Sequence, residues 1–134
     1  MQDTPEDSVF TKIIRGEIPC HKVYEDEKNI CILPLNPIAK GHVLVIPKLQ
    51  VDHFQDLPDE DYQSLMAAVK KVAQRMKQVL GTRRVGLKIE GLGVPHAHVH
   101  VIAFDTAEEY NEPIVDDGNP DHEALARLAQ TLAF

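Results

Sequence analysis

The chain has 134 residues and a mass of 15.0 kDa, which suits one domain built around a single core. Its 14 basic and 21 acidic residues give a formal net charge of −7. This balance argues against a general binder of nucleic acid backbones, which needs a basic face. The acidic N-terminus and the short apolar runs predict neither a secretory signal nor a membrane span. We expect Cys20 and Cys31 to be free thiols of a cytoplasmic protein.

The first half of the chain predicts a short helix followed by three strands. "SVFTKIIRG" (residues 8–16) predicts a helical turn that ends at Gly16. "HKVYED" and "ICIL" predict two short strands joined by the polar turn at residues 25–29. After the loop "LNPIAKG", the β-branched run "HVLVIP" (residues 42–47) predicts a well-buried strand.

The second half contains the clearest helix of the sequence, over residues 59–80. Acidic residues after Pro58 suit its start, and Gly81 suits its end. Its apolar residues recur every three or four positions and form one stripe: Tyr62, Leu65, Met66, Val69, Val72, Ala73, Met76, Val79 and Leu80.

Beyond this helix, "VGLKIEG" and "HAHVHVIAF" predict another strand pair, and residues 105–118 predict an acidic loop. Asn119 and Pro120 are expected to cap and begin a last helix, whose apolar face holds Leu125, Leu128, Ala129 and Leu132. Helices separate from a mainly antiparallel sheet define the α+β class. We expect one domain over residues 1–134, with a core of about 8–104 and a tail of 105–134.

Three histidines stand at alternate positions in "HAHVHVIAF". Alternate residues of a strand share one face, so His96, His98 and His100 line one side while the apolar residues between them point into the core. A polar, solvent-facing strand without chemistry is one interpretation, but such positions are more often Lys, Glu, Thr or Ser. A metal site is a second, but this segment offers no carboxylate or thiolate to complete the ligand set.

The third interpretation is covalent catalysis by an imidazole on phosphorus. A histidine is largely neutral near pH 7, so it is nucleophilic without a separate base. Neighbouring imidazoles can donate to the phosphate oxygens, where charge shifts in the transition state. This chemistry needs several histidines on one surface, and the alternation supplies them.

The segment "HAHVHVI" resembles the histidine triad of the HIT superfamily. "VFTKIIRGEIPCHKVYED" and "NPIAKGHVLVIPK" resemble family segments as well, so the resemblance covers roughly residues 8–104. It implies five antiparallel strands with one long helix and short terminal helices, which pair through the helix and a strand into a ten-stranded dimeric sheet. It also implies transfer or hydrolysis of nucleotides at the α-phosphorus through a nucleotidyl-histidine intermediate.

The resemblance assigns expected roles to individual residues. His98 matches the nucleophile, His100 the histidine that contacts the phosphate, and His96 the one that supports the network. His42 matches a fourth histidine beside the triad, although a buried structural histidine would look the same. The resemblance also points to an apolar base slot and two further contacts with the substrate: Val9, Phe10, Ile13 and Ile32, with Glu90 and the Val94 backbone.

Several positions depart from the family pattern. Pro34 stands where many relatives have an Asp that binds ribose, and Glu90 stands where Asn is frequent. The loop "EGLGVP" is short and lacks the usual side chain that helps the leaving group. Some bacterial relatives bind zinc through cysteines and a histidine at positions that match Ser8, Thr11 and Gln50, so we expect no metal and no cofactor.

The sequence therefore predicts a cytoplasmic, homodimeric hydrolase acting on a small-molecule nucleotide, with no nucleic acid or membrane partner. The first choice of substrate is a purine nucleoside phosphoramidate or a related adenylated small molecule. Dinucleoside polyphosphate hydrolysis is the alternative enzyme activity. A nucleotide-binding or regulatory protein with weak turnover is the alternative outside enzymes.

Overall fold

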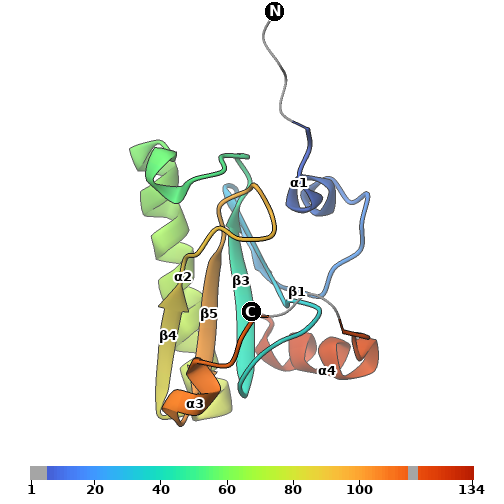
Figure 1. Cartoon of the computed structure of the whole chain (residues 1–134), viewed down its shortest axis with the longest axis vertical. Coiled ribbons are helices and arrows are strands. Elements are labelled where there is room, and N and C mark those ends of the chain that lie inside the picture. Colours follow the sequence, from blue (N-terminus) through green and yellow to red (C-terminus); the bar gives the residue numbers. More distant parts are fainter. Residues whose placement is uncertain (1–5, 115–117) are drawn as a thin grey trace, which may run out of the picture.

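The computed structural model describes residues 6–114 and 118–134, which form one sheet with helices on both of its faces (Figure 1). The strands are β1 (Lys22–Glu25), β2 (Asn29–Ile32), β3 (Gly41–Pro47), β4 (Arg84–Lys88) and β5 (Val99–Phe104). The helices are α1 (Val9–Ile14), α2 (Asp59–Leu80), α3 (Ala107–Tyr110) and α4 (His122–Leu132), with a 3₁₀ turn at Phe54–Asp56.

The five strands form an antiparallel sheet in the order β1-β2-β3-β5-β4, which confirms the predicted α+β architecture. The central pair β3 and β5 sets the position of the site, because Leu44 of β3 pairs with His100 of β5. On the other side of β5, Lys88 of β4 also pairs with His100. His100 therefore lies in the middle of the sheet, and β4 is its edge strand.

Strand alternation divides the interior into two clusters, one on each face of the sheet. The face toward α2 and α4 carries Val43, Val45, Val99 and Val101, all fully buried. The opposite face carries Ile30, Ile32, Leu44 and Ile46, which pack with Phe10 of α1. Each of these strand residues thus packs in one cluster only. The triad histidines lie on the face of the sheet that α1 covers.

Helix α2 begins and ends as the sequence predicts. Asp59, Glu60 and Asp61 lie in its first turn, near the positive end of the helix dipole, and Gly81 closes it with a left-handed φ of 65°. Its buried side chains are Leu65, Ala68, Val69, Val72 and Met76.

Four predicted boundaries were wrong. Strand β4 ends at Lys88, three residues before the end of the predicted segment "VGLKIEG". Strand β5 begins at Val99, so His96 and His98 precede it: Ala97 N–H donates to Val51 O instead of pairing with β3. Helix α3 occupies part of the predicted acidic loop, because Thr106 and Glu109 form a capping box. Helix α4 is capped by Asp121, two residues after the predicted cap. Residues 115–117 of the predicted loop lie outside the described residues.

Two further predictions concern the cysteines and membrane-spanning helices. Both cysteines are free: Cys31 is buried and Cys20 is half-buried. Within the described ranges, no helix has the length and apolarity needed to cross a bilayer.

Candidate active site

The three triad histidines are buried on the α1 face of the sheet, just before and within β5. The ring of Phe10 lies edge-on to His96 at 5.7 Å and to His98 at 5.1 Å between centroids. The rings of His98 and His100 are 5.0 Å apart. Ala97 belongs to the cluster on the other face, so the predicted alternation is confirmed even where the segment precedes the strand.

His96 is held at both ring nitrogens. Its Nε2 lies 2.7 Å from the Pro47 carbonyl oxygen, which only accepts, so Nε2 carries the proton. Its Nδ1 then accepts from the Ser8 hydroxyl at 2.7 Å. The Ser8 hydroxyl in turn accepts from Thr11 N–H at 3.0 Å and caps α1. The first helix is thus tied directly to the triad segment.

The backbone of His96 determines the tautomer of His98. Nδ1 of His98 lies 2.8 Å from the His96 carbonyl oxygen and must donate to it. In the neutral ring, Nε2 therefore keeps its lone pair. Within the described ranges, this atom has no hydrogen-bonding partner, which leaves it available to attack an electrophile.

A second hydrogen-bonded chain determines the tautomer of His100. Ile38 N–H donates to His42 Nδ1 at 3.2 Å, so the proton of neutral His42 lies on Nε2. This Nε2–H donates to His100 Nδ1 at 2.9 Å, which places the His100 proton on Nε2. That buried Nε2 has no partner among the described residues. An acceptor from a ligand would satisfy it.

Burial keeps these imidazoles neutral. His42 is fully buried, and burial, with the nearby charges of His100 and Lys88, lowers its pKa to about 3. Burial, His98 and Lys88 lower the pKa of His100 to about 4. Burial also lowers the pKa of His96, against the opposing effect of its hydrogen bond to Pro47. The neutral ring of His100 can therefore act as a hydrogen-bond donor near pH 7.

Two charged side chains flank His100. Glu90 Oε1 lies 4.0 Å from His100 Nε2, too far for a hydrogen bond, and its side chain is 39% exposed. Lys88 Nζ donates to the Tyr110 carbonyl at 2.6 Å and lies 4.5 Å from the centre of the Tyr110 ring, and its charge contributes to the lowered pKa of His100. The free His100 donor thus has a carboxylate at 4.0 Å.

The predicted apolar slot is only partly assembled. Phe10 and Ile32 are buried together, and Ile13 and Val94 pack against their cluster. Val9 lies on the outer side of α1, with 40% of its surface exposed. Three of the four predicted slot residues therefore share one face of the sheet with Val94, and Val9 is not part of that cluster.

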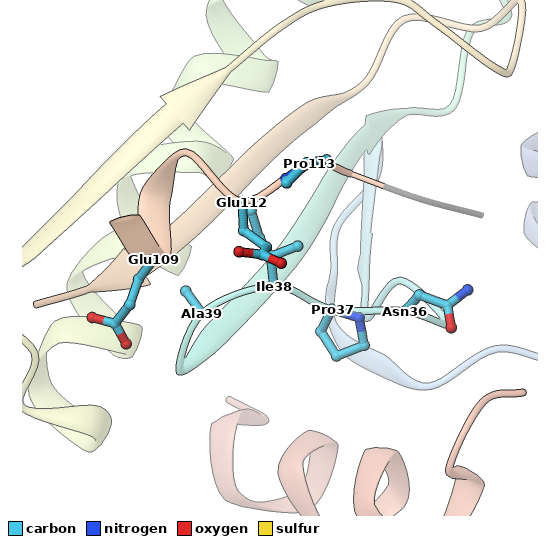
Figure 2. Close-up of a pocket in the computed structure, with 7 residues that line it drawn as sticks. All are labelled: Asn36, Pro37, Ile38, Ala39, Glu109, Glu112 and Pro113. Atoms are coloured by element: carbon cyan, nitrogen blue, oxygen red, sulfur yellow. The ribbon is translucent and has the colours of Figure 1, made fainter. Parts of the chain in front are cut away.

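Two surface cavities adjoin this region without containing a triad histidine among their lining residues. One, of about 380 Å³, lies between the loop before β3 and the segment around α3 (Figure 2). Ile38 in its wall is the residue whose N–H begins the chain to His100. The other, of about 330 Å³, lies beside the end of α1 and includes Ile13 and Cys20.

A histidine triad is expected to have buried rings with fixed tautomers. Here the Pro47 and His96 carbonyls orient His96 and His98, and His100 keeps a free Nε2–H. The HIT domain model of protein families matches residues 15–107. The chain belongs to the HIT family. It is 36% identical over 101 residues to an adenylylsulfatase of Arabidopsis thaliana, a match that covers 72% of this chain and 51% of that protein. It is 38% identical over 97 residues to an adenosine 5′-monophosphoramidase of Saccharomyces cerevisiae, covering 70% of this chain and 60% of that one.

Solved HIT structures share the fold over nearly the whole chain. A HIT-like protein from Bartonella henselae aligns with a TM-score of 0.83 and 29% identity, covering 98% of this chain and 97% of that one. A zinc-bound histidine triad protein from Mycobacterium smegmatis aligns with a TM-score of 0.72 and 28% identity, covering 92% and 91%. These matches confirm the five-stranded antiparallel sheet.

The residues at the positions where some relatives bind zinc do meet here, but their side chains do not suit zinc. Gln50 Oε1 accepts from Ser8 N–H at 2.9 Å and from the Thr11 hydroxyl at 2.6 Å. With the bond from Ser8 to His96, these groups satisfy one another, and they offer neutral oxygens where zinc prefers thiolate and imidazole. Within residues 6–114 and 118–134, no cluster of three His, Cys, Asp or Glu side chains is arranged for a metal ion. That the protein binds no metal stays a prediction.

Several contributors to the HIT site escaped the sequence analysis. The Pro47 carbonyl, Ile38 N–H and Lys88 all act on the histidines, and two of the three act through the backbone, which sequence does not display. Lys88 could have been suspected from the sequence, because it lies two residues from Glu90 on a predicted strand and would share its face. The paired register with His100 was needed to place it.

Proposed function

We propose that this chain is a HIT-type hydrolase that cleaves at the α-phosphorus of a purine nucleotide, with His98 as the nucleophile. The substrate class is a nucleoside phosphoramidate or a related adenylated small molecule. The observation that carries the proposal is the pair of fixed tautomers: His98 has a free lone pair on Nε2, and the neighbouring His100 ring, 5.0 Å away, has a free N–H on Nε2.

The proposed reaction has two displacements. In the first, His98 Nε2 forms a bond to phosphorus while the bond from phosphorus to the leaving amine breaks. The amine departs with a proton from a water molecule. In the second, the oxygen of that water attacks phosphorus, the bond to His98 breaks, and the nucleoside monophosphate is released. His100 Nε2–H donates to a phosphoryl oxygen in both transition states.

The backbone of His96 supports His98 during this cycle. When His98 carries the nucleotidyl group it is cationic, and its Nδ1–H points at the His96 carbonyl, whose dipole favours that charge. In the neutral ring, the same contact holds the proton on Nδ1 and leaves the lone pair on Nε2 before attack. His96 itself acts as a positioning residue, because its ring is fully engaged by Ser8 and Pro47.

The similarity to an adenylylsulfatase and to an adenosine 5′-monophosphoramidase supports an adenylated substrate. A direct test is the hydrolysis of adenosine 5′-phosphoramidate and of dinucleoside polyphosphates by the purified chain. We expect the phosphoramidate to be hydrolysed faster, because Glu90 repels additional phosphate charge. Faster cleavage of a dinucleoside polyphosphate would instead assign the chain to that class of hydrolase.

One observation favours a nucleotide-binding protein with weak turnover as a second candidate. Pro34 offers ribose neither a side-chain acceptor nor a backbone donor, and the loop at residues 90–95 is short. If neither substrate is hydrolysed while adenosine nucleotides bind, this second candidate is correct.

We also propose that the chain acts as a homodimer associated through β4 and the exposed side of α2. Strand β4 is a sheet edge, and its Leu87 is 39% exposed. On α2, Tyr62 is 40% exposed and Met66 is half-buried, so apolar surface remains after the helix covers its own sheet. An unpaired edge beside an apolar strip is a natural site of association.

Sedimentation should therefore find a dimer, and Met66→Lys should shift it toward monomer. Gln78→Lys, at an exposed position of the same helix, is the matched control and should not change the mass. Met76 of the same apolar stripe is fully buried in the core of its own subunit, so a charge there would unfold the protein. A wild-type monomer at high micromolar concentration would contradict the proposal.

A further inference from the structure

The free donor of His100 and the carboxylate of Glu90 face the same small space. His100 Nε2 is buried without a partner, and Glu90 Oε1 lies 4.0 Å from it. A phosphoryl oxygen that accepts from this N–H at about 2.8 Å would lie no farther than about 7 Å from the carboxylate oxygen. Any ligand that uses this donor must therefore place its phosphorus beside a negative charge.

Among the described residues, Glu90 forms no ion pair with a lysine or arginine. Lys88, at the end of β4, donates to the Tyr110 carbonyl and not to Glu90, although its charge still acts on His100. The three rings of His42, His96 and His100 are neutral at pH 7, because burial opposes their protonation. The carboxylate is only partly exposed, so water screens it incompletely.

We propose that Glu90 makes this site selective for the charge of the group attached to the α-phosphorus. It favours a nucleoside 5′-phosphoryl monoanion whose leaving group carries a positive charge, such as the phosphoramidate of a diamine. It disfavours a leaving group that carries a negative charge. This inference rests on the proposed function, and it names the substrate class for the same site.

The same carboxylate acts on the product. Hydrolysis converts a phosphoryl monoanion into a nucleoside monophosphate dianion, and the added charge arises within reach of Glu90. For two unit charges about 7 Å apart near a protein surface, the interaction corresponds to an effect of roughly tenfold to fiftyfold on affinity. Glu90 therefore weakens product binding by about that factor and promotes release.

Three adenosine 5′-phosphoramidates with tails of equal length test this charge selectivity. One tail ends in an ammonium group, one in a methyl group and one in a carboxylate. The value of kcat/KM for each is measured with the wild type, with Glu90→Gln, and with the control Glu27→Gln, which removes an exposed carboxylate from the turn between β1 and β2. Dissociation constants of the three compounds and of AMP are measured with His98→Ala and with His98→Ala/Glu90→Gln, so that no compound is turned over.

The wild type and Glu27→Gln should prefer the ammonium tail over the carboxylate tail by about tenfold or more. In Glu90→Gln this ratio should fall to within about threefold, and AMP should bind about tenfold more tightly to the double variant. Equal tail preferences with and without Glu90 would overturn the inference while the proposed function stands. If the wild type hydrolyses none of the compounds, the proposed function fails, and the affinities still decide whether Glu90 selects by charge.

Discussion

His98→Ala is expected to reduce kcat by roughly 10⁴-fold or more, the scale on which removal of a covalent nucleophile acts. Nucleotide affinity should change by no more than a few-fold, because the His100 donor and the apolar cluster around Phe10 and Ile32 remain. After rapid mixing of the wild type with substrate, mass spectrometry should find an acid-labile nucleotidyl adduct on His98.

A second variant separates the loss of the nucleophile from a local rearrangement. In His98→Asn, the side-chain amide can still donate to the His96 carbonyl, but no nitrogen occupies the place of Nε2. It should be as inactive as His98→Ala and as stable as the wild type. His53→Ala removes an exposed histidine and should be fully active. An adduct on His96 or His100, or turnover by either His98 variant, would show that the nucleophile is wrongly assigned.

The order of the helices and strands was predictable, and so was the placement of the three histidines on one face. Both depend on the local periodicity of the sequence. The three-and-four spacing of α2 and the alternation around His98 each follow from the geometry of a single element. The start of β5 was not predictable, because it depends on where β3 stops pairing. Helix α3 was missed because its one capping box lies in an acidic stretch that otherwise has the composition of a loop.

The contacts that orient the histidines could not be predicted, because they join distant parts of the chain. Ser8 and His96 are 88 residues apart, and His42 and His100 are 58 apart. His42 pairs with Ile102, so it reaches His100 as a diagonal neighbour. Only the register of β3 against β5 reveals that contact. The histidines themselves could be identified from the sequence. Which ring nitrogen of each carries the proton depends on contacts that form only in the folded sheet.

The buried histidines are also expected to make the protein sensitive to mild acid. The folded pKa of His42 is about 3 and that of His100 about 4, whereas an unfolded histidine has a pKa of about 6.5. Between these values the unfolded chain binds more protons than the folded one, so stability falls as pH falls. Lowering the pH from 7 to 5 should reduce the free energy of unfolding by about 2 kcal/mol per buried histidine, or about 4 kcal/mol for this pair.

Urea unfolding at a series of pH values measures this loss of free energy. The pH range over which stability falls identifies the groups that cause it. Carboxyl groups whose pKa is lowered by a cation, such as Glu25 beside Lys22, contribute stability that is lost as the pH falls below about 5. His42→Gln keeps an amide that can donate to His100 Nδ1 but cannot titrate, so it should lower stability at pH 7 yet lose about 2 kcal/mol less than the wild type between pH 7 and 5. His53→Gln, at an exposed position, should show the same pH dependence as the wild type. Equal losses in the wild type and His42→Gln would mean that His42 is not held neutral by the fold, and the tautomer chain that gives His100 its free N–H would then have to be revised.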